Sequence, residues 1–337
     1  MTIAYYTGNY YLWVAIELIF GIIYSIILNW KVNQVYPWLK SNISEGKNKY
    51  QDNKIIITKA KQMFVHLLAS TGRNQILPFL IYAFASLKIV AYYGNYMVII
   101  DKVTGFVNQV LGSTTAGVGS LIAENNKEKT LQIYWEFITL RFFVAGVLIF
   151  SLYNLIEPFV KLWLGNEYIL DNKVFIIILC NIFVSLTRGT NDQFINGYGL
   201  FHDIWAPIVT LFLTIGVAIF CGSIWGLFGV LLGDITSSII IINIWKPYFL
   251  FKQGFQLSVR KYWKQIFKNL MMLVIVWICS SCILNFISIN PYYNYKTWIM
   301  YAFLVTSLFS CLYFGGMLLI NKNSVKGLII RIVKLKK

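Results

Sequence analysis

Nine apolar runs, separated by short polar connections, follow one another along this 337-residue chain. Each run is long enough to cross the ~30 Å hydrocarbon core of a bilayer as an α-helix. The pattern predicts an all-α fold, a polytopic membrane helical bundle of about nine transmembrane helices. The predicted spans are residues 10–28, 63–85, 89–123, 131–155, 174–198, 204–222, 224–245, 267–288 and 297–320.

The run at 89–123 is predicted as one continuous helix of roughly 50 Å, which exceeds the bilayer core. Polar residues recur on one of its faces, and a face of this kind indicates a helix that lines a polar interior. The polar face is formed by Asn95, Lys102, Gln109 and Ser113.

Glycines at regular spacing indicate where helix backbones approach closely. One set recurs at every seventh position of the 89–123 helix, and it consists of Gly105, Gly112 and Gly119. A second set lies in the span at 224–245, and it consists of Gly226, Gly229 and Gly233. Close packing against a neighbouring helix is predicted at both.

Polar residues also interrupt the second span, where Arg73, Asn74 and Gln75 are followed by Pro78. Proline cannot donate a helical hydrogen bond, so a helix break is predicted at Pro78. Transporters place substrate sites at helices that are broken within the membrane. Arg73 has no acidic residue within a helical turn, and an unpaired guanidinium is suited to bind a phosphate group through two hydrogen bonds.

Each charged residue within a span is expected to have an ion-pair partner or a function, because a charged side chain at the bilayer centre costs at least ~2.5 kcal/mol. Arg188 and Asp192 are four residues apart on one helical face, which favours an ion pair. Arg141 is expected to snorkel or to pair with Glu136. Lys102 is expected to find a partner other than Asp101, because adjacent side chains point about 100° apart. Candidates for holding a coupling ion or pairing with an arginine are Glu17, Asp101, Asp192 and Asp234.

The composition excludes an ordinary soluble domain, because 58% of the residues are hydrophobic and only 12% are charged. The formal net charge of +16 could suggest a nucleic-acid partner, but the basic residues lie in short segments between apolar runs, and no nucleic acid is expected. With two histidines, and with five cysteines inside or at the edges of apolar runs, neither a metal site nor a cofactor is predicted.

Most lysines and arginines fall in alternate connections and in the C-terminal segment. The positive-inside rule therefore places those connections and the C-terminus in the cytoplasm. With an odd number of spans the N-terminus is then outside, which is the arrangement expected of a chain that lacks its front end.

Four segments resemble one known family. They are GSTTAGVGSLIAENNKEK (112–129), FVKLWLGNEYIL (159–170), NGYGLFHDIWAPIV (196–209) and WGLFGVLLGDITSSIIIINIWKPYFLFKQGF (225–255). Together they resemble Wzx-like polysaccharide-biosynthesis or O-antigen flippases, within the multidrug/oligosaccharidyl-lipid/polysaccharide exporter superfamily. The resemblance extends from Tyr10 to about Ile320.

The resemblance implies two six-helix lobes around a central cavity, with an extra pair of C-terminal helices. Residues 1–29 then hold the last helix of the N-terminal lobe, 30–61 a basic cytoplasmic linker and 62–246 the six-helix C-terminal lobe. Residues 247–265 form a basic cytoplasmic loop, 266–320 the two additional helices and 321–337 a basic cytoplasmic tail. About five N-terminal spans are absent, so a missing N-terminal half or a second copy of the chain would have to complete the cavity.

The same resemblance implies a transporter of the bacterial inner membrane rather than an enzyme. It would move a lipid-linked oligosaccharide, an undecaprenyl-diphosphate-linked repeat unit, across the membrane by alternating access, in contact with membrane lipids. The candidate cavity residues are Arg73, Asn74, Gln75, Asn95, Lys102, Gln109 and Arg188.

Two alternatives stay open at this stage. One is a cation-coupled drug or metabolite antiporter of the same fold, which would favour an acidic cavity. The other is an inactive truncated remnant that merely inserts into the membrane. A membrane-embedded enzyme is disfavoured, because such an enzyme needs paired catalytic groups beside a sizeable loop, and the connections here are short.

Overall fold

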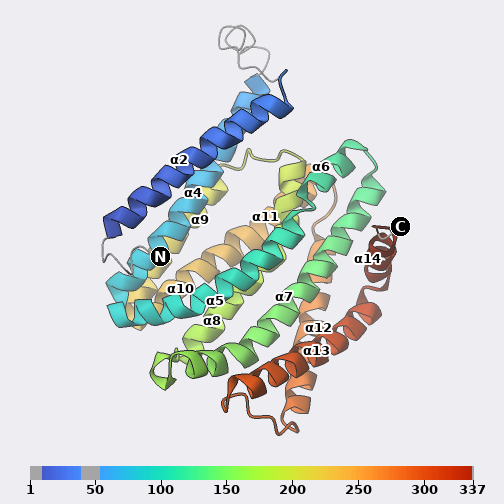
Figure 1. Ribbon diagram of the computed structural model, residues 1–337. Helices are drawn as coiled ribbons and strands as arrows, with labels where there is room; N and C mark the ends of the chain where they lie inside the picture. Colours follow the sequence, from blue (N-terminus) through green and yellow to red (C-terminus); the bar gives the residue numbers. More distant parts are fainter. Residues whose placement is uncertain (1–9, 39–53, 336–337) are drawn as a thin grey trace. The chain divides into compact units, whose positions relative to one another are not determined.

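The computed structural model describes residues 10–38 and 54–335, and within those ranges the chain is helical without strands (Figure 1). The predicted all-α fold is confirmed. Seven helical segments are long and apolar enough to cross a membrane. They are Tyr11–Val35, Lys127–Trp163, Asn172–Gly197, Trp205–Trp225, Leu227–Phe255, Arg260–Leu284 and Tyr295–Ile320.

The two remaining predicted spans lie in α4 (Lys54–Phe84) and α5 (Leu87–Gly112), which are not among these seven. Both helices are long enough to span a bilayer. Their mean hydropathy is lowered by polar residues, which include Arg73 and Asn74 in α4 and Asp101 and Lys102 in α5. The number of about nine transmembrane helices therefore stays a prediction.

The chain divides into two compact units, residues 1–58 and 59–337. In the first unit, α2 (Tyr10–Val35) is apolar along most of its length and carries the exposed Glu17. The helix continues beyond the predicted limit of 28 or 29. Residues 1–9, the segment 39–53 of the predicted linker, and residues 336–337 of the predicted tail lie outside the described part.

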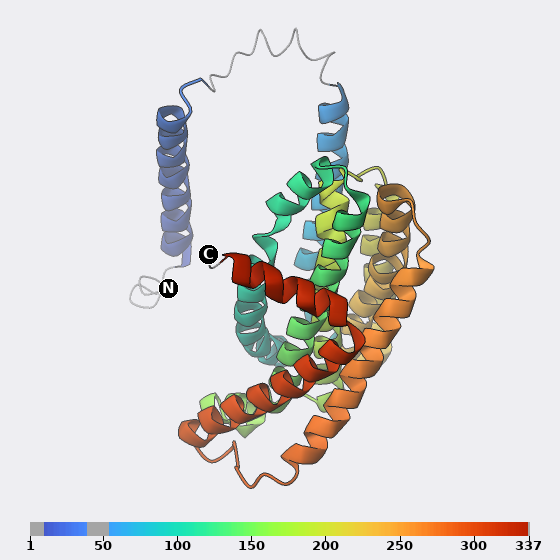
Figure 2. The same cartoon turned by 90° about the vertical axis from the view of Figure 1, so that its right-hand side faces the viewer.

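The second unit is organised around the 37-residue helix α7 (Lys127–Trp163). This helix packs against α8 (Asn172–Gly197) and against α13 (Tyr295–Ile320) (Figures 1 and 2). The other elements are α6 (Thr115–Ala123), the 3₁₀-helix η1 (Asn166–Tyr168), α9 (Trp205–Trp225), α10 (Leu227–Ser237), the π-helix η2 (Ser238–Trp245), α11 (Lys246–Phe249), the π-helix η3 (Leu250–Phe255), α12 (Arg260–Leu284) and α14 (Lys322–Leu335).

Two clusters of buried apolar side chains meet at α7. On one side Ala145 and Ile149 pack with residues of α5, α8 and α10. On the other side Phe150 stacks on Phe309 of α13, with 4.2 Å between the ring centroids, and Tyr313 lies beside them. Helix α7 therefore joins the two cores and fixes α8 relative to α13.

The prediction of one helix over 89–123 is wrong, because α5 ends at Gly112 and α6 begins at Thr115. The hydroxyl groups of Ser113, Thr114 and Thr115 donate to the carbonyl oxygens three residues before them, at 2.7–2.8 Å. Side chains of this type compete with the helical backbone pattern. The amide of Gln193 on α8 donates to Leu111 O at 2.9 Å and so supplies a tertiary partner at the break.

The predicted break at Pro78 is also wrong. Helix α4 continues from Lys54 to Phe84 with Pro78 inside it. One proline removes a single helical hydrogen bond, and the turns on either side continue the helix. The irregular backbone lies instead in η2 and η3, where wide π-turns begin at Ser238. As a result, the predicted loop at 247–265 is helical as far as Phe255 and again from Arg260.

The two glycine sets have different outcomes. A Cβ atom at Gly229 or Gly233 would collide with the backbone of α9, so the close packing predicted at these two positions is confirmed. Gly226 instead lies in the turn between α9 and α10, where its φ is 58°. Gly105, Gly112 and Gly119 have no atom within 4 Å of where a Cβ would stand. The prediction of close packing is therefore wrong for that set within the described part of the chain.

This contrast gives a matched pair of substitutions. Gly229→Ala is expected to lower the free energy of unfolding by about 2 kcal/mol, because the added methyl group meets a backbone carbonyl that cannot rotate away. Gly105→Ala adds the same group to open space and is expected to be neutral or stabilising by up to about 1 kcal/mol. Thermal unfolding in detergent, followed by tryptophan fluorescence, measures both, and equal losses of stability would show that α9 and α10 do not pack closely.

Candidate functional site

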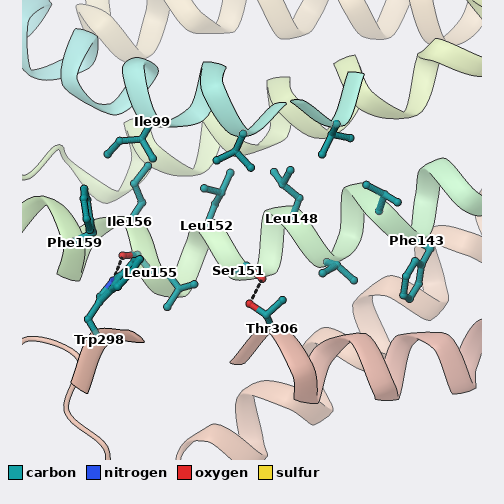
Figure 3. A pocket seen from close by; sticks show the side chains of 14 residues that line it. Ile99, Phe143, Leu148, Ser151, Leu152, Leu155, Ile156, Phe159, Trp298 and Thr306 are labelled. Atoms are coloured by element: carbon teal, nitrogen blue, oxygen red, sulfur yellow. Dashed lines mark hydrogen bonds between the residues drawn. The ribbon is translucent and has the colours of Figure 1, made fainter. Parts of the chain in front are cut away.

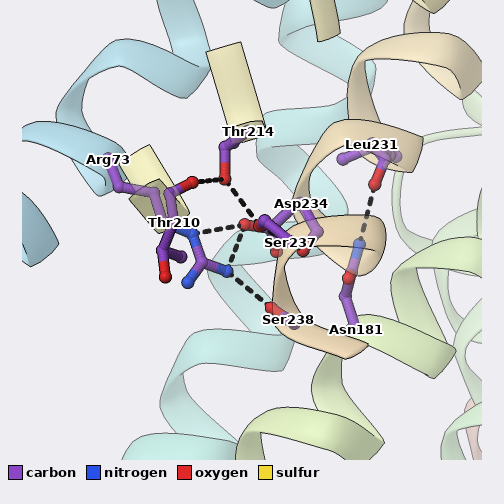
Figure 4. A network of polar contacts seen from close by, with 8 residues as sticks. All are labelled: Arg73, Asn181, Thr210, Thr214, Leu231, Asp234, Ser237 and Ser238. Atoms are coloured by element: carbon purple, nitrogen blue, oxygen red, sulfur yellow. Dashed lines mark hydrogen bonds and ion pairs between the residues drawn. The ribbon is translucent and has the colours of Figure 1, made fainter. Parts of the chain in front are cut away.

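Arg73 of α4 and Asp234 of α10 are 161 residues apart in sequence and form an ion pair between the two helices (Figure 4). Arg73 Nε donates to Asp234 Oδ1 at 2.8 Å, and Nη2 donates both to the same oxygen and to Ser238 Oγ. The side chains are only 14% and 23% exposed. The sequence-based expectation of an unpaired guanidinium is therefore wrong, since the partner comes from a distant helix.

A chain of hydroxyl groups continues behind the carboxylate. Ser237 Oγ donates to the backbone oxygen of Asp234 at 3.0 Å and lies 2.7 Å from Thr214 Oγ1 of α9. Thr214 in turn donates to Thr210 O at 2.8 Å. The ion pair is thus held by three helices, and the π-turn of η2 starts at Ser238, which is one of its partners. Wide turns of this kind are common at functional sites.

A cavity of about 630 Å³ lies on the Asp234 side of the pair, between α4, α5, α8 and α10. We call it the acidic cavity, because Asp101 and Asp234 line it and no lysine or arginine does. Its other polar lining residues are Asn74, Tyr93, Thr104, Asn108, Asn181 and Ser185. Asn181 donates to Leu231 O at 3.3 Å, while its buried Oδ1 is left without a partner among the described residues.

A second cavity, of about 320 Å³, lies on the Arg73 side, between α4, α8, α9 and η2. We call it the basic cavity, because Arg73, Arg188 and Lys246 line it together with His66, against the single carboxylate of Asp192. Arg188 Nε lies 3.4 Å from Asp192 Oδ2, so the predicted i,i+4 pair is present. Arg73 and Arg188, which the sequence analysis chose as candidate cavity residues, therefore line the same cavity.

A third cavity, of about 470 Å³, is almost wholly apolar (Figure 3). It lies between α5, α7 and α13 and has no titratable side chain in its lining. Its two hydroxyl groups, on Ser151 and Thr306, lie 3.1 Å apart and satisfy each other, and the Trp298 indole donates to Leu155 O at 3.0 Å. This cavity suits a hydrocarbon chain and offers nothing to a charged group.

The polar face proposed for the 89–123 helix does not line these cavities. Asn95, Lys102 and Gln109 are absent from all three linings, as is Gln75 of α4. The face of α5 that borders the acidic cavity carries Tyr93, Met97, Asp101, Thr104 and Asn108 instead. Helical periodicity places residues on a common face, but only the packing of neighbouring helices determines which face borders the cavity.

Arg141 also differs from expectation. It is 5% exposed and donates to Leu186 O of α8 at 3.2 Å, above Gly189, where any side chain would collide with the guanidinium. It neither snorkels nor pairs with Glu136. Glu136 is fully buried and accepts from Arg331 Nε of α14 at 2.6 Å.

Sequence reasoning missed a charged cluster beside the basic cavity. Asp203, in the connection between α8 and α9, is 2% exposed and accepts from Lys246 Nζ at 2.8 Å and from Trp245 Nε1 at 3.1 Å. His66 Nε2 of α4 lies 3.4 Å from its other oxygen. Burial raises the pKa of Asp203, but the contacts with His66, Lys246 and Trp245 outweigh burial and lower the pKa below its ordinary value of 3.8.

The cluster predicts a specific pH dependence. Because the pKa of Asp203 is lower in the folded state, the ionised carboxylate stabilises the fold above pH 3.8, and this stabilisation is lost as the pH falls through the folded-state pKa. Asp203→Asn is expected to cost about 3 kcal/mol at neutral pH, since Lys246 loses its partner, and the difference from the unmodified protein should shrink below pH 3.8.

Thermal unfolding in detergent, measured across this pH range, tests the dependence. Glu128→Gln, which removes an exposed carboxylate at the start of α7, is the control and should leave the unfolding temperature unchanged. A difference between Asp203→Asn and the unmodified protein that stays constant through acidic pH would show that the carboxylate charge does not stabilise the fold.

No protein-family model, curated protein or solved structure matches this chain. The resemblance to polysaccharide flippases therefore rests on the four sequence segments quoted above. What the protein does is argued from the two polar cavities and from the ion pair between them.

Proposed function

We propose that the chain is part of a transporter that moves a lipid-linked oligosaccharide across the bacterial inner membrane by alternating access. One observation carries the proposal: a basic and an acidic cavity lie on opposite sides of the Arg73–Asp234 pair. A phosphate-linked substrate needs cations at the place where it enters the protein. The basic cavity offers a guanidinium that can form two parallel hydrogen bonds to a phosphate group.

The distribution of charge along the chain supports an orientation in which the basic cavity is nearer the cytoplasm. The positive-inside rule places the α8–α9 connection in the cytoplasm, together with the C-terminus. Asp203 lies in that connection and contacts His66 and Lys246, which line the basic cavity. The basic cavity is then the one nearer the cytoplasm, where a lipid-linked oligosaccharide would be loaded.

In this proposal the ion pair supplies the coupling step. A diphosphate competes with the Asp234 carboxylate for the same guanidinium, because both are anions that accept from Arg73. When the substrate takes Arg73, Asp234 is left as an unpaired carboxylate at the edge of the acidic cavity, where a cation or proton would neutralise it. The apolar cavity between α5, α7 and α13 suits part of the polyprenyl chain.

Exposed polar residues support the need for a second lobe or a second copy. Asp101, Lys102, Asn108 and Gln109 are all exposed on α5 in this chain. Lipid-facing helices do not carry such residues, whereas a helix that faces another protein surface or a water-filled cavity does. A further lobe, or another copy of this chain, would cover that face.

A charge-neutral double substitution tests the role of the ion pair in transport. Arg73→Gln with Asp234→Asn removes both charges, so it leaves no unpaired ion and should change the stability by no more than about 1 kcal/mol. It is expected to slow translocation of a fluorescent lipid-linked oligosaccharide in proteoliposomes at least about tenfold, since charge-assisted hydrogen bonds to the phosphate are lost. Lys129→Gln with Glu124→Gln neutralises an exposed pair elsewhere and is the control.

Unchanged translocation in the Arg73/Asp234 double variant would contradict the proposed role of the pair. Translocation no faster than in protein-free liposomes, with the chain alone and with a second lobe supplied in the same membrane, would contradict the flippase proposal as a whole.

A cation-coupled antiporter is the second candidate, and the acidic cavity is the observation in its favour. In that case Asp101→Asn should abolish uptake of a lipophilic cation driven by a proton or sodium gradient. Gradient-driven cation uptake in proteoliposomes distinguishes the two functions, because a flippase shows none with the oligosaccharide absent.

A further inference from the structure

A fourth cavity, of about 540 Å³, lies between α7, the first turns of α12 and the junction of α13 with α14. Four lysines line it, and its lining includes no carboxylate. We call it the lysine cavity; the lysines are Lys261, Lys264, Lys268 and Lys322. It is separate from the basic and acidic cavities, because it shares no lining residue with either of them.

The sequence concentrates three of the lysines on one helical face. Lys261, Lys264 and Lys268 follow one another at spacings of three and four residues, so they project from the same side of α12. Like charges at these spacings destabilise a helix. Such an arrangement is expected where an anion offsets the repulsion.

The fourth lysine is brought to the cavity by a network of amides. Asn321, between α13 and α14, donates to Asn269 Oδ1 at 2.8 Å, and Gln265 donates to Asn321 Oδ1. Asn269 is fully buried and Asn321 is 6% exposed. This network fixes the α13–α14 junction against α12, and Lys322 at the start of α14 is held beside the other three lysines.

The buried carboxylate of Glu136, which follows the cavity-lining Trp135, does not serve these lysines. Glu136 lies on α7 and accepts from Arg331 at 2.6 Å and from Gln132 at 2.9 Å. Within the described part of the chain, none of the four lysines is ion-paired with a carboxylate. Four positive charges are thus gathered without a protein counter-ion.

The position of the cavity indicates the source of the anion. Helix α14 runs crosswise to α7 and α12 (Figure 2), and it presents both the exposed Ile329 and Ile330 and the exposed Lys326. A basic amphipathic helix of this kind lies at the level of lipid headgroups. Exposed apolar side chains continue along α12 beyond the lysines, at Met271 and Ile275.

We propose that the lysine cavity binds the phosphate group of an anionic membrane phospholipid. The four ammonium groups surround the headgroup phosphate, and the first backbone N–H groups of α14 add partial positive charge on the same side. The acyl chains lie against the apolar side chains of α12 that follow the lysines. The site binds a lipid that stays in place and does not depend on which substrate the protein transports.

Native mass spectrometry of the whole chain in detergent tests the proposal, with phosphatidylglycerol and phosphatidylcholine as the two lipid probes. Phosphatidylglycerol should be retained in preference to phosphatidylcholine, with one molecule bound more tightly than the rest. Lys264→Gln with Lys268→Gln should weaken that binding about thirtyfold, because two ammonium–phosphate contacts of about 1 kcal/mol each are lost.

The control removes two charges outside the lining. Arg260→Gln with Lys326→Gln removes one exposed cation from α12 and one from α14. Neither Arg260 nor Lys326 lines the cavity, so this double variant should change the affinity less than about twofold. Equal weakening in the two double variants would overturn the proposal in favour of bulk electrostatic attraction. Equal retention of the two lipids by the unmodified protein would also overturn it.

Glycerol 1-phosphate is the soluble probe that distinguishes the two sources of phosphate. It should fail to displace bound phosphatidylglycerol, because it lacks the acyl chains. Displacement, together with binding of glycerol 1-phosphate alone, would assign the cavity to a soluble phosphate and overturn the lipid proposal. Lys322→Gln, on a different helix from the other lysines, should weaken phosphatidylglycerol binding independently.

Discussion

The cost of a charge in an apolar medium constrains this structure more than any other factor, and the Arg73–Asp234 pair is the clearest case. Neither residue has a suitable partner on its own helix, so α4 and α10 must pack at one particular height and rotation to bring them together. Ser238 accepts a further hydrogen bond from Arg73, and a chain of hydroxyl groups on Ser237 and Thr214 ties the backbone of Asp234 to α9. The close approach of α9 and α10 at Gly229 and Gly233 makes that chain geometrically possible.

The same constraint explains the other buried charges. Arg141 is placed against a backbone carbonyl of α8, over a glycine that leaves it room. Glu136 is neutralised by Arg331 and thereby holds α14 against α7. Each buried ion is thus also a tertiary contact between two helices. The lysine cavity is the exception, because its charges are exposed at one end of the bundle and have no carboxylate beside them.

The two polar cavities gain their character from the ion pair that lies between them. Arg73 faces one cavity and Asp234 the other, so each cavity is left with charges of mainly one sign. A ligand that replaces either partner changes the charge of the opposite cavity. In the proposed transporter this arrangement would link two binding events without a long pathway between them, which is the physical basis of the proposed coupling.

The amino-acid sequence by itself determined the fold class, the position of most apolar helices, the local Arg188–Asp192 pair and the close packing at Gly229 and Gly233. These features depend on composition, on helical periodicity and on residues near one another in the chain, all of which can be inferred from the sequence. It also singled out Arg73 and Asp234 individually, as charged residues within predicted transmembrane spans.

Only the tertiary structure decided which charges of different segments meet. The partner of Arg73 lies 161 residues away, the cluster around Asp203 combines three separate segments, and the cavity-lining face of α5 is set by its neighbours rather than by its own polarity. The break after Gly112 depends partly on Gln193, and the continuity of α4 through Pro78 on the turns that flank it. Periodicity specifies an angle around one helix axis, whereas an ion pair or a cavity requires the relative height and rotation of several helices, which packing alone determines.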